Sequence, residues 1–343
     1  MNHHHIFGPV ISRRLGRSLG IDLIPYKTCS YNCVYCECGK TTDLTSIRKE
    51  FFQTGDIIDE LDKVLASSPK LDYITFAGSG EPTLSLSLGP VLAHLKKNYP
   101  DYKVAVLTNG SLCTDPDVRR DLIAADIVSP TLTTATQQVF EKIHRPVPGL
   151  QVTDIIRGIR SFRDEYKGEI WLEVFLVPGL NTSEDELEKL RTTIYSIKPE
   201  LIQLNYLDRP GTEPWVSPPE PLLSGRIREY FAEGEIPVEL IGFDERVPLL
   251  THDDSTALIN ETLKRRPLTA EDIAQMTGLS TPEVRKKLAL MVLEGVVQAK
   301  SGDRGIFYWI ASDGSERFSE KDRSYADDPP KKLQRIFWAL KIL

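Results

Sequence analysis

The sequence predicts an α/β fold in which six parallel strands alternate with helices, followed by a small domain of helices and a hairpin. Three observations lead to this prediction. Between residues 19 and 206, short apolar runs of strand length alternate with segments that have helical periodicity. Glycine-rich, polar turns follow these runs at one end. After residue 255 the pattern changes to helices joined by a glycine turn and then two short strands. Alternating strands and helices build parallel β/α units, as an open doubly wound sheet or as part of a barrel.

The strands are placed by apolar runs and the helices by periodicity and end signals. One helix start is explicit, because Ser183 followed by Glu186 forms a capping box. The expected strands are 19–24, 73–77, 103–107, 127–128, 169–176 and 201–206. The expected helices are 51–66, 84–97, 115–124, 136–143, 152–162 and 183–197.

Four segments are expected along the chain. Residues 1–215 form the α/β core, and 216–254 form a linker or covering segment that begins in a proline-rich stretch. Residues 255–311 form the small domain, with helices at 257–264, 268–279 and 281–294 and strands at 296–300 and 305–310. Residues 312–343 form a tail, in which 331–343 has the spacing of an amphipathic helix.

The composition is that of an ordinary globular protein, and it excludes several classes. The chain has 343 residues, of which 41% are hydrophobic and 27% charged. No apolar run approaches the roughly 18 residues of a membrane span. A net charge of −7 gives no general reason to expect nucleic-acid binding by the whole surface. Five cysteines without a signal peptide indicate a reducing, cytoplasmic location.

Three of these cysteines stand close together directly after the first strand. Cys29, Cys33 and Cys36 have C-x3-C-x2-C spacing on one polar loop. Three thiolates on one loop can all reach one soft metal centre. Cubane iron–sulfur clusters usually take four cysteines, so three would leave one iron open.

Three other interpretations of the loop stay open at this point. Cys38 would complete a set of four for structural zinc, although no second, separated cysteine pair is present. A disulfide disagrees with the cysteine-poor composition. Unrelated buried cysteines would be unusual on a polar loop. We interpret Cys38 as a bystander thiol and Cys113 as a buried apolar residue.

The unusual loops all follow the carboxyl ends of the predicted strands, where parallel β/α folds place their chemistry. The loop at 78–83 contains two glycines, which let backbone groups approach a ligand closely. Its Glu81 can accept a hydrogen bond from an ammonium group. The other strands run into polar turns at 108–110, 129–131, 177–182 and 207–210.

The cysteine spacing, with Tyr35 before the last cysteine, resembles the signature of the radical S-adenosylmethionine (radical SAM) superfamily, and Ser79-Gly80-Glu81 resembles its Gly-Gly-Glu motif. Residues 6–215 resemble more closely an archaeal and bacterial group called radical SAM Fe–S oxidoreductases, which is related to the wyosine-forming tRNA enzymes. The segments that carry this closer resemblance are 7–9, 12–20, 79–84, 108–110 and 143–146.

The resemblance implies an incomplete (β/α)6 barrel and two cofactors, a [4Fe–4S] cluster and S-adenosylmethionine. Cys29, Cys33 and Cys36 would hold the cluster, whose open iron would bind the amino and carboxylate groups of S-adenosylmethionine. By the same resemblance, reductive cleavage yields a 5′-deoxyadenosyl radical, which takes a hydrogen atom from an unidentified substrate. An external electron donor of the flavodoxin or ferredoxin type is implied. The cofactor-binding residues would be Tyr35, Gly78, Ser79, Gly80, Glu81, Asn109, Thr131, Thr133 and Val177.

Two features near this site have alternative interpretations. The group pattern has Ser-Leu-Asp after the fourth strand, but this chain has Thr131-Leu132-Thr133. A carboxylate contact to the ribose is therefore in doubt, although the two threonines can hydrogen-bond hydroxyls. Upstream, Arg13, Arg14 and Arg17 either meet an anionic substrate or the cofactor carboxylate, or they pair with nearby acids.

The small domain resembles a winged helix. In DNA readers of this kind the second helix of the motif enters the major groove, and here it carries Arg285, Lys286 and Lys287. Residues 255–311 contain eight basic and six acidic side chains, and this difference of +2 is weak for duplex DNA. Docking of an RNA or of a protein or peptide substrate is therefore expected equally. The alternative to an enzyme is an iron–sulfur redox or iron sensor that regulates DNA without S-adenosylmethionine chemistry.

Overall fold

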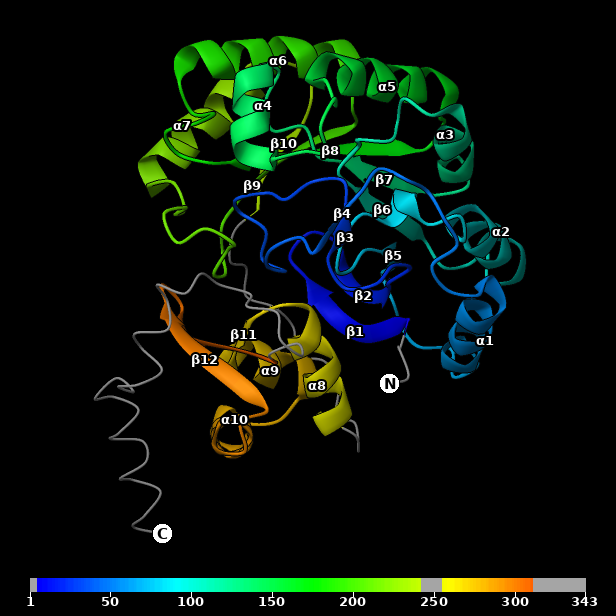
Figure 1. The fold of residues 1–343 in the computed structure, drawn as a ribbon, viewed down its shortest axis with the longest axis vertical. Helices are drawn as coiled ribbons and strands as arrows, with labels where there is room; N and C mark the ends of the chain where they lie inside the picture. Colours follow the sequence, from blue (N-terminus) through cyan, green and yellow to red (C-terminus); the bar gives the residue numbers. More distant parts are fainter. Residues whose placement is uncertain (1–4, 242–254, 311–343) are drawn as a thin grey trace.

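One eight-stranded sheet is the centre of the molecule (Figure 1). The computed structural model describes residues 5–241 and 255–310. The strand order is β1-β2-β5-β6-β7-β8-β9-β10, with β1 antiparallel to β2 and the remaining neighbours parallel. The strands are β1 (Ile6–Ser12), β2 (Gly16–Ile21), β5 (Tyr73–Phe76), β6 (Val104–Thr108), β7 (Ile127–Pro130), β8 (Glu169–Leu176), β9 (Leu201–Tyr206) and β10 (Val238–Leu240). The predicted α/β class is confirmed, and the sheet is mixed and not closed among the described residues.

Helices connect the parallel strands, as the sequence periodicity predicts. They are α1 (Thr54–Leu65), α2 (Leu88–Asn98), α3 (Pro116–Leu122), α4 (Gln137–His144), α5 (Val152–Glu165), α6 (Glu184–Ile197) and α7 (Pro221–Ala232). At the start of α6 the side chain of Ser183 accepts a hydrogen bond from the Glu186 amide. Asp115 caps α3 in the same way, and Pro116 follows it in the first turn, where no amide donor is needed.

The strand β1, the helix α7 and the strand β10 were not predicted from the sequence. β1 escapes pattern recognition because Gly8 and Pro9 interrupt its alternation, and the ladder to β2 shifts register between Phe7 and Val10. α7 and β10 lie within the segment interpreted as a linker or cover. β10 has only three residues, none fully buried, and it pairs with β9 at the edge of the sheet.

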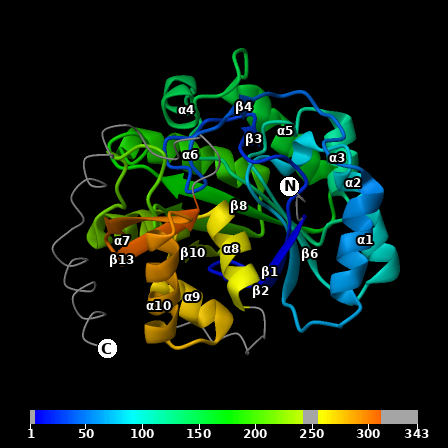
Figure 2. The same ribbon diagram turned by 60° about the horizontal axis from the view of Figure 1, so that its bottom comes forward.

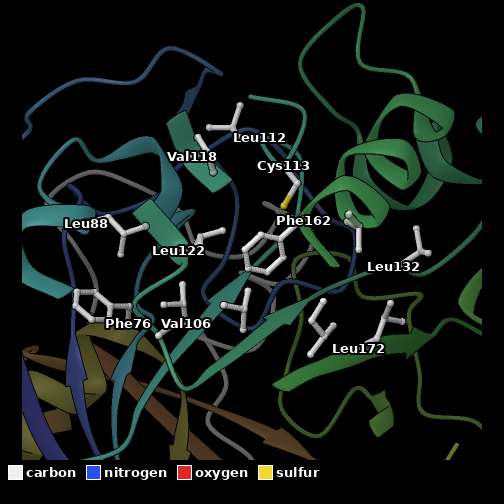
Figure 3. Close-up of a cluster of buried hydrophobic side chains, with 14 of the residues drawn as sticks. Phe76, Leu88, Val106, Leu112, Cys113, Val118, Leu122, Leu132, Phe162 and Leu172 are labelled. Carbon is white, nitrogen blue, oxygen red and sulfur yellow. The ribbon is translucent and has the colours of Figure 1, made fainter. Parts of the chain in front are cut away.

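The core lies between the sheet and the helices that pack on it (Figure 3). Phe76, Val106 and Leu172 come from three strands and meet Leu122 and Phe162 from two helices. All five side chains are completely buried. Burial on this scale contributes about 1.5–3 kcal/mol for each large apolar side chain, so the sheet is a rigid support for the loops at its ends.

The C-terminal domain, residues 255–310, consists of three helices and a three-stranded sheet of order β11-β13-β12. Its elements are α8 (Ser255–Arg265), β11 (Leu268–Thr269), α9 (Ala270–Thr277), α10 (Thr281–Leu293), β12 (Val297–Gly302) and β13 (Gly305–Ile310). Its buried cluster includes Val10 of β1, with Phe7 and Ile11 packed against it. The domain therefore shares its apolar core with the edge strand of the main sheet (Figure 2).

Two further expectations concern the C-terminal tail and membrane-spanning helices. The tail helix at 331–343 lies outside the described residues. None of the helices in the described part of the chain combines the length and the apolar character needed to cross a membrane.

Candidate functional site

The loop that carries the three cysteines and the glycine loop, residues 78–83, lie against each other. The cysteine loop, residues 27–39, starts with the two-residue strand β3 (Thr28–Cys29), which pairs with β4 (Asp43–Leu44). The Lys27 amide donates to the Ser79 carbonyl at 3.1 Å, and the Glu81 amide donates to the Thr28 carbonyl at 3.2 Å. A Cβ atom on Gly80 would lie 1.9 Å from the same Thr28 carbonyl oxygen. Only glycine permits this approach, so Gly80 is what lets the two loops touch.

Each of the three predicted ligand sulfurs has a nitrogen close to it. Cys36 Sγ lies 3.1 Å from Lys27 Nζ, and Cys33 Sγ lies 3.2 Å from His144 Nδ1. Cys29 Sγ lies 3.6 Å from Asn109 Nδ2 and 3.5 Å from the Tyr31 amide nitrogen. Nitrogen donors around sulfur stabilise the charged thiolate form that binds metal.

The two other cysteines have different surroundings. Cys38 Sγ donates to the Gly78 carbonyl at 3.6 Å, a contact that suits a protonated thiol. Cys113 is buried in the core, and burial raises the pKa of its thiol to about 12. The side-chain nitrogen contacts given above belong instead to Cys29, Cys33 and Cys36.

The thiol pKa values within the set differ. Burial raises the pKa of Cys29 to about 11, and burial also raises the pKa of Cys33 well above its usual range. A hydrogen bond with Cys38, followed by the Lys27 ammonium, holds the pKa of Cys36 below its usual range against the effect of burial. Among the three, Cys36 is therefore the thiol that deprotonates most readily.

The three thiols are a donor set that a polynuclear cluster can use. Within residues 5–241 and 255–310, no three His, Cys, Asp or Glu side chains converge closely enough to hold one metal ion. In a cubane each iron has its own cysteine, so the three sulfurs surround a cluster and need not converge on one point. Three half-buried thiols on one loop, each with a nitrogen neighbour, are a donor set of this kind.

Glu81 connects the glycine loop to the next strand. Its side chain is 2% exposed, and Oε1 accepts from Thr83 Oγ1 and from Thr108 Oγ1, both at 2.6 Å. Oε2 accepts from the Asn109 amide at 2.7 Å. Burial raises the pKa of Glu81, although these hydrogen bonds act to lower it. The hydrogen-bond partners are uncharged, so they solvate the carboxylate without neutralising it.

Asn109 joins this corner to the cysteine loop. Besides its contact with Cys29, its Nδ2 atom donates to Ser30 Oγ at 2.8 Å, and Ser30 Oγ lies 2.7 Å from Ser111 Oγ. Its Oδ1 atom accepts from the Ser111 amide at 2.9 Å. The structure thus brings Gly78, Ser79, Gly80, Glu81 and Asn109 together with the cysteines at one corner of the sheet.

The remaining predicted cofactor residues lie in the cysteine loop itself or directly after strands β7 and β8. Tyr35 stacks on Phe175, with ring centroids 3.8 Å apart and an interplanar angle of 8°. Val177 is completely buried beside Val34 in the same apolar cluster. Thr131 Oγ1 donates to Glu173 Oε2 at 2.7 Å, which places a carboxylate next to the threonine pair. Thr133 is buried, and its Oγ1 atom has no hydrogen-bond partner among the described residues.

Two of the three upstream arginines pair with acids, as one of the two alternatives expects. Arg14 donates through Nη1 to Glu173 Oε1 at 2.8 Å and through Nε to Gln203 Oε1 at 2.8 Å. Arg13 lies 3.4 Å from Asp208 and 3.6 Å from Glu37. Arg17 Nη1 lies on the exposed side and donates to the Lys70 carbonyl at 3.4 Å.

Sequence reasoning missed three residues of this site. Asp22 accepts from the hydroxyl of Ser79 at 2.8 Å and from its amide at 3.2 Å, so it fixes the position of Ser79 in the glycine loop. Its signal is a carboxylate inside the apolar run at 19–24. Lys27 and His144 contact the sulfurs of Cys36 and Cys33. Burial lowers the pKa of His144 to about 3, which keeps this ring neutral.

Comparisons with known proteins agree with this geometry. Residues 23–191 match the family model described as "Radical SAM superfamily". A UPF0026 protein from Methanocaldococcus jannaschii is 32% identical over 309 residues, which cover 88% of this chain and 94% of that protein. A protein of Brachyspira hyodysenteriae named GTPase Obg is 42% identical over 199 residues. Those residues cover 58% of this chain and 29% of that protein, so this chain corresponds to less than a third of it.

Among solved structures, a radical SAM methyltransferase from Sphaerobacter thermophilus has a similar fold, with a TM-score of 0.52 and 14% identity. The match covers 65% of each chain. At this identity the likeness concerns the fold alone. The near-full-length match, the family model and the fold lead to one conclusion: this chain belongs to the UPF0026 family and is an enzyme of the radical SAM superfamily.

Proposed function

We propose that this enzyme cleaves S-adenosylmethionine reductively at a [4Fe–4S] cluster held by Cys29, Cys33 and Cys36, and that a hydrogen atom is then abstracted from a substrate. The cluster, when bound and reduced by an external flavodoxin or ferredoxin, supplies the electron that makes a 5′-deoxyadenosyl radical from S-adenosylmethionine. The observation that carries the proposal is the direct backbone pairing of the cysteine loop with the glycine loop.

Different residues are assigned to the cluster and to S-adenosylmethionine. The nitrogen atoms of Lys27, Asn109 and His144 stabilise negative charge on the three sulfurs. Glu81 offers a buried carboxylate whose described hydrogen-bond partners are all neutral, and an ammonium group is the complement that such a carboxylate requires. Glu81 is therefore assigned to the amino group of S-adenosylmethionine, within the loop formed by Gly78, Ser79 and Gly80.

The remaining predicted cofactor residues are assigned to the adenosyl part. Tyr35 and Val177 provide apolar surface, and Thr131 and Thr133 provide hydroxyls. We assign Glu173 to the role of the aspartate that the group pattern has after the fourth strand, because its carboxylate accepts a hydrogen bond from Thr131. A carboxylate accepts hydrogen bonds from sugar hydroxyls in the same manner whichever strand carries it.

For the C-terminal domain we propose a winged-helix module that docks a large substrate, as RNA or as protein. The alternative of a DNA-regulating sensor is weakened by two contacts. Arg285 on α10 pairs with Glu271 of the same domain at 2.6 Å. Arg304, in the turn between β12 and β13, is held by Asp208 and Asp272. Both arginines are thereby less available to DNA phosphates, and duplex binding depends on such charges.

Anaerobic reconstitution with iron and sulfide tests the proposed function. We expect about four irons and four sulfides per chain, with visible absorbance and an electron paramagnetic resonance (EPR) signal after reduction. Addition of S-adenosylmethionine should change that signal, because the open iron gains ligands. Tightly bound zinc in place of iron, or a signal that S-adenosylmethionine leaves unchanged, would contradict the proposal.

A further inference from the structure

The contact between the C-terminal domain and the sheet domain contains a buried network of charges. Arg209, in the loop after β9, is 2% exposed, and its Nη1 atom donates to Glu37 Oε2 at 3.1 Å. Its Nη2 atom lies 3.8 Å from Asp272 of α9. Arg304 lies 2.9 Å from Asp208 and 3.1 Å from Asp272. Asp272 and Arg304 of the C-terminal domain are thus paired with two adjacent residues of the sheet domain, Asp208 and Arg209.

The network continues to the cysteine loop. Glu37 directly follows Cys36, and its Oε1 atom accepts from the amides of Asp208 and Arg209, each at 3.3 Å. Thr212 Oγ1 donates to the Cys36 carbonyl at 3.1 Å. The loop after β9 therefore lies along the last ligand position, and whatever fixes this loop also fixes Cys36.

A second contact reaches the glycine loop. Arg265 at the end of α8 lies 3.7 Å from Asp22 Oδ2, which is the atom that accepts from both donors of Ser79. The guanidinium also stacks on Phe7 of β1, with 4.4 Å to the ring centroid. A Cβ atom on Gly78 would lie 2.3 Å from the Asp22 carboxyl carbon, so loop and carboxylate are in close contact. The C-terminal domain is thus connected to both loops of the site.

We propose that the C-terminal domain positions the cofactor site, with Arg209, Asp272 and Arg304 as positioning residues for Cys36 and with Arg265 and Asp22 for the glycine loop. Buried charges of this kind are costly to leave unpaired, so the docked arrangement of the domain is strongly preferred over a loosely tethered one. In this arrangement the domain acts on the reaction through the geometry of the two loops, in addition to any docking of substrate. The proposal rests on the proposed cluster function of the cysteines.

Hydrogen–deuterium exchange on the full-length protein without cluster tests the positioning directly. In Arg304→Gln we expect exchange of residues 33–39 to be about tenfold faster than in wild type, because the loop after β9 loses its support. Asp272→Asn should have the same effect, and Asn keeps the side-chain oxygen that accepts from the Thr269 amide and caps α9. Arg304→Lys keeps the charge but loses the fork of donors, so it should restore part of the protection.

Arg285→Gln is the matched control. It breaks an ion pair of the same domain, but this pair is 61% and 53% exposed and joins two residues within the C-terminal domain. Its exchange over 33–39 should equal that of wild type. Circular dichroism of each variant establishes that it is folded. Equal exchange in Arg304→Gln, Asp272→Asn and Arg285→Gln would overturn the proposal.

A readout on the reconstituted protein separates positioning from stability. We expect Arg304→Gln to retain its iron but to show an altered EPR signal and a dissociation constant for S-adenosylmethionine raised about tenfold, as for outer contacts of a metal site. An unchanged signal and affinity would mean that the contact is merely structural. If wild type takes up no iron, the proposed function fails, while the exchange experiment on the cluster-free protein still decides the positioning.

Discussion

Glu81 in the glycine loop and Asp272 in the C-terminal domain are both buried carboxylates, yet their pKa values shift in opposite directions. Burial raises the pKa of Glu81, whose hydrogen-bond partners are uncharged. For Asp272 burial acts in the same direction, but Arg209 and Arg304 outweigh it and lower the pKa to about 2. The charge of Asp272 is therefore balanced by two arginines of the chain, whereas the described hydrogen-bond partners of Glu81 are all uncharged, which is the difference that the proposed function explains by a cationic ligand.

The largest expected effect concerns the three predicted ligand sulfurs. Replacing Cys29, Cys33 or Cys36 by Ala should abolish cluster assembly, because each removes the ligand of one iron. Cys38→Ala and Cys113→Ala are the controls and should keep the iron and sulfide content of wild type. Iron and sulfide analysis after anaerobic reconstitution checks this. A cluster that survives Cys33→Ala but not Cys38→Ala would reassign the ligands.

The next effect tests Glu81 itself. Glu81→Gln keeps the shape of the side chain and removes its charge, so S-adenosylmethionine should bind about 10- to 100-fold more weakly, as expected when a buried charge pair is lost. The cluster should still assemble, because Glu81 contacts no sulfur ligand in the proposal. Calorimetric titration of the reconstituted protein measures the affinity. An unchanged affinity would remove Glu81 from the binding site.

A third prediction concerns the balanced carboxylate. The pKa of Asp272 is about 2 in the fold against an ordinary value of 3.8, so its ionised form stabilises the protein by about 2 kcal/mol above pH 4. This contribution is lost as the pH falls from about 4 to about 2. Asp272→Asn should therefore be less stable than wild type by about 2 kcal/mol at pH 7, and the difference should shrink below pH 4. Urea unfolding of the cluster-free proteins between pH 3 and pH 7 measures it.

Glu81 should give the opposite sign in the same experiment. Its raised folded pKa means a contribution that is present below its ordinary value of 4.5 and lost as the pH rises through the folded value. As the pH rises, the free energy of unfolding of wild type should therefore fall relative to that of Glu81→Gln. Relative to Asp272→Asn, the free energy of unfolding of wild type should rise with pH. Parallel pH profiles for Asp272→Asn and Glu81→Gln would contradict the comparison.

The smallest effect concerns the surface of the C-terminal domain. Lys286→Ala with Lys287→Ala should leave cluster assembly and S-adenosylmethionine affinity unchanged, because α10 belongs to no contact of the charge network described above. If the docked substrate is RNA, the double variant should bind it more weakly and with a smaller dependence on salt. Filter binding of transfer RNA at two salt concentrations measures this. Equal RNA binding by variant and wild type would favour a protein or peptide substrate.

More of the fold than of the site could be predicted from the sequence. The alternation of strands and helices places the cysteine loop and the glycine loop at one end of the sheet, because the carboxyl ends of parallel strands all lie at the same edge. The role of Gly80 could be expected from its residue type. The pairing of Arg209 with Glu37 and Asp272 could not, because it joins residues far apart in the chain. β1 was missed for a local reason, since Gly8 and Pro9 hide its alternation.

The central claim is that this chain makes a radical from S-adenosylmethionine, and one measurement tests it most directly. Reconstituted wild type, reduced with dithionite and supplied with S-adenosylmethionine, should slowly form 5′-deoxyadenosine and methionine even without substrate, as chromatography would show. Cys33→Ala should form neither, and Glu81→Gln should form both more slowly at limiting S-adenosylmethionine. A wild-type protein that carries a reducible four-iron cluster and yet forms no 5′-deoxyadenosine would contradict the account.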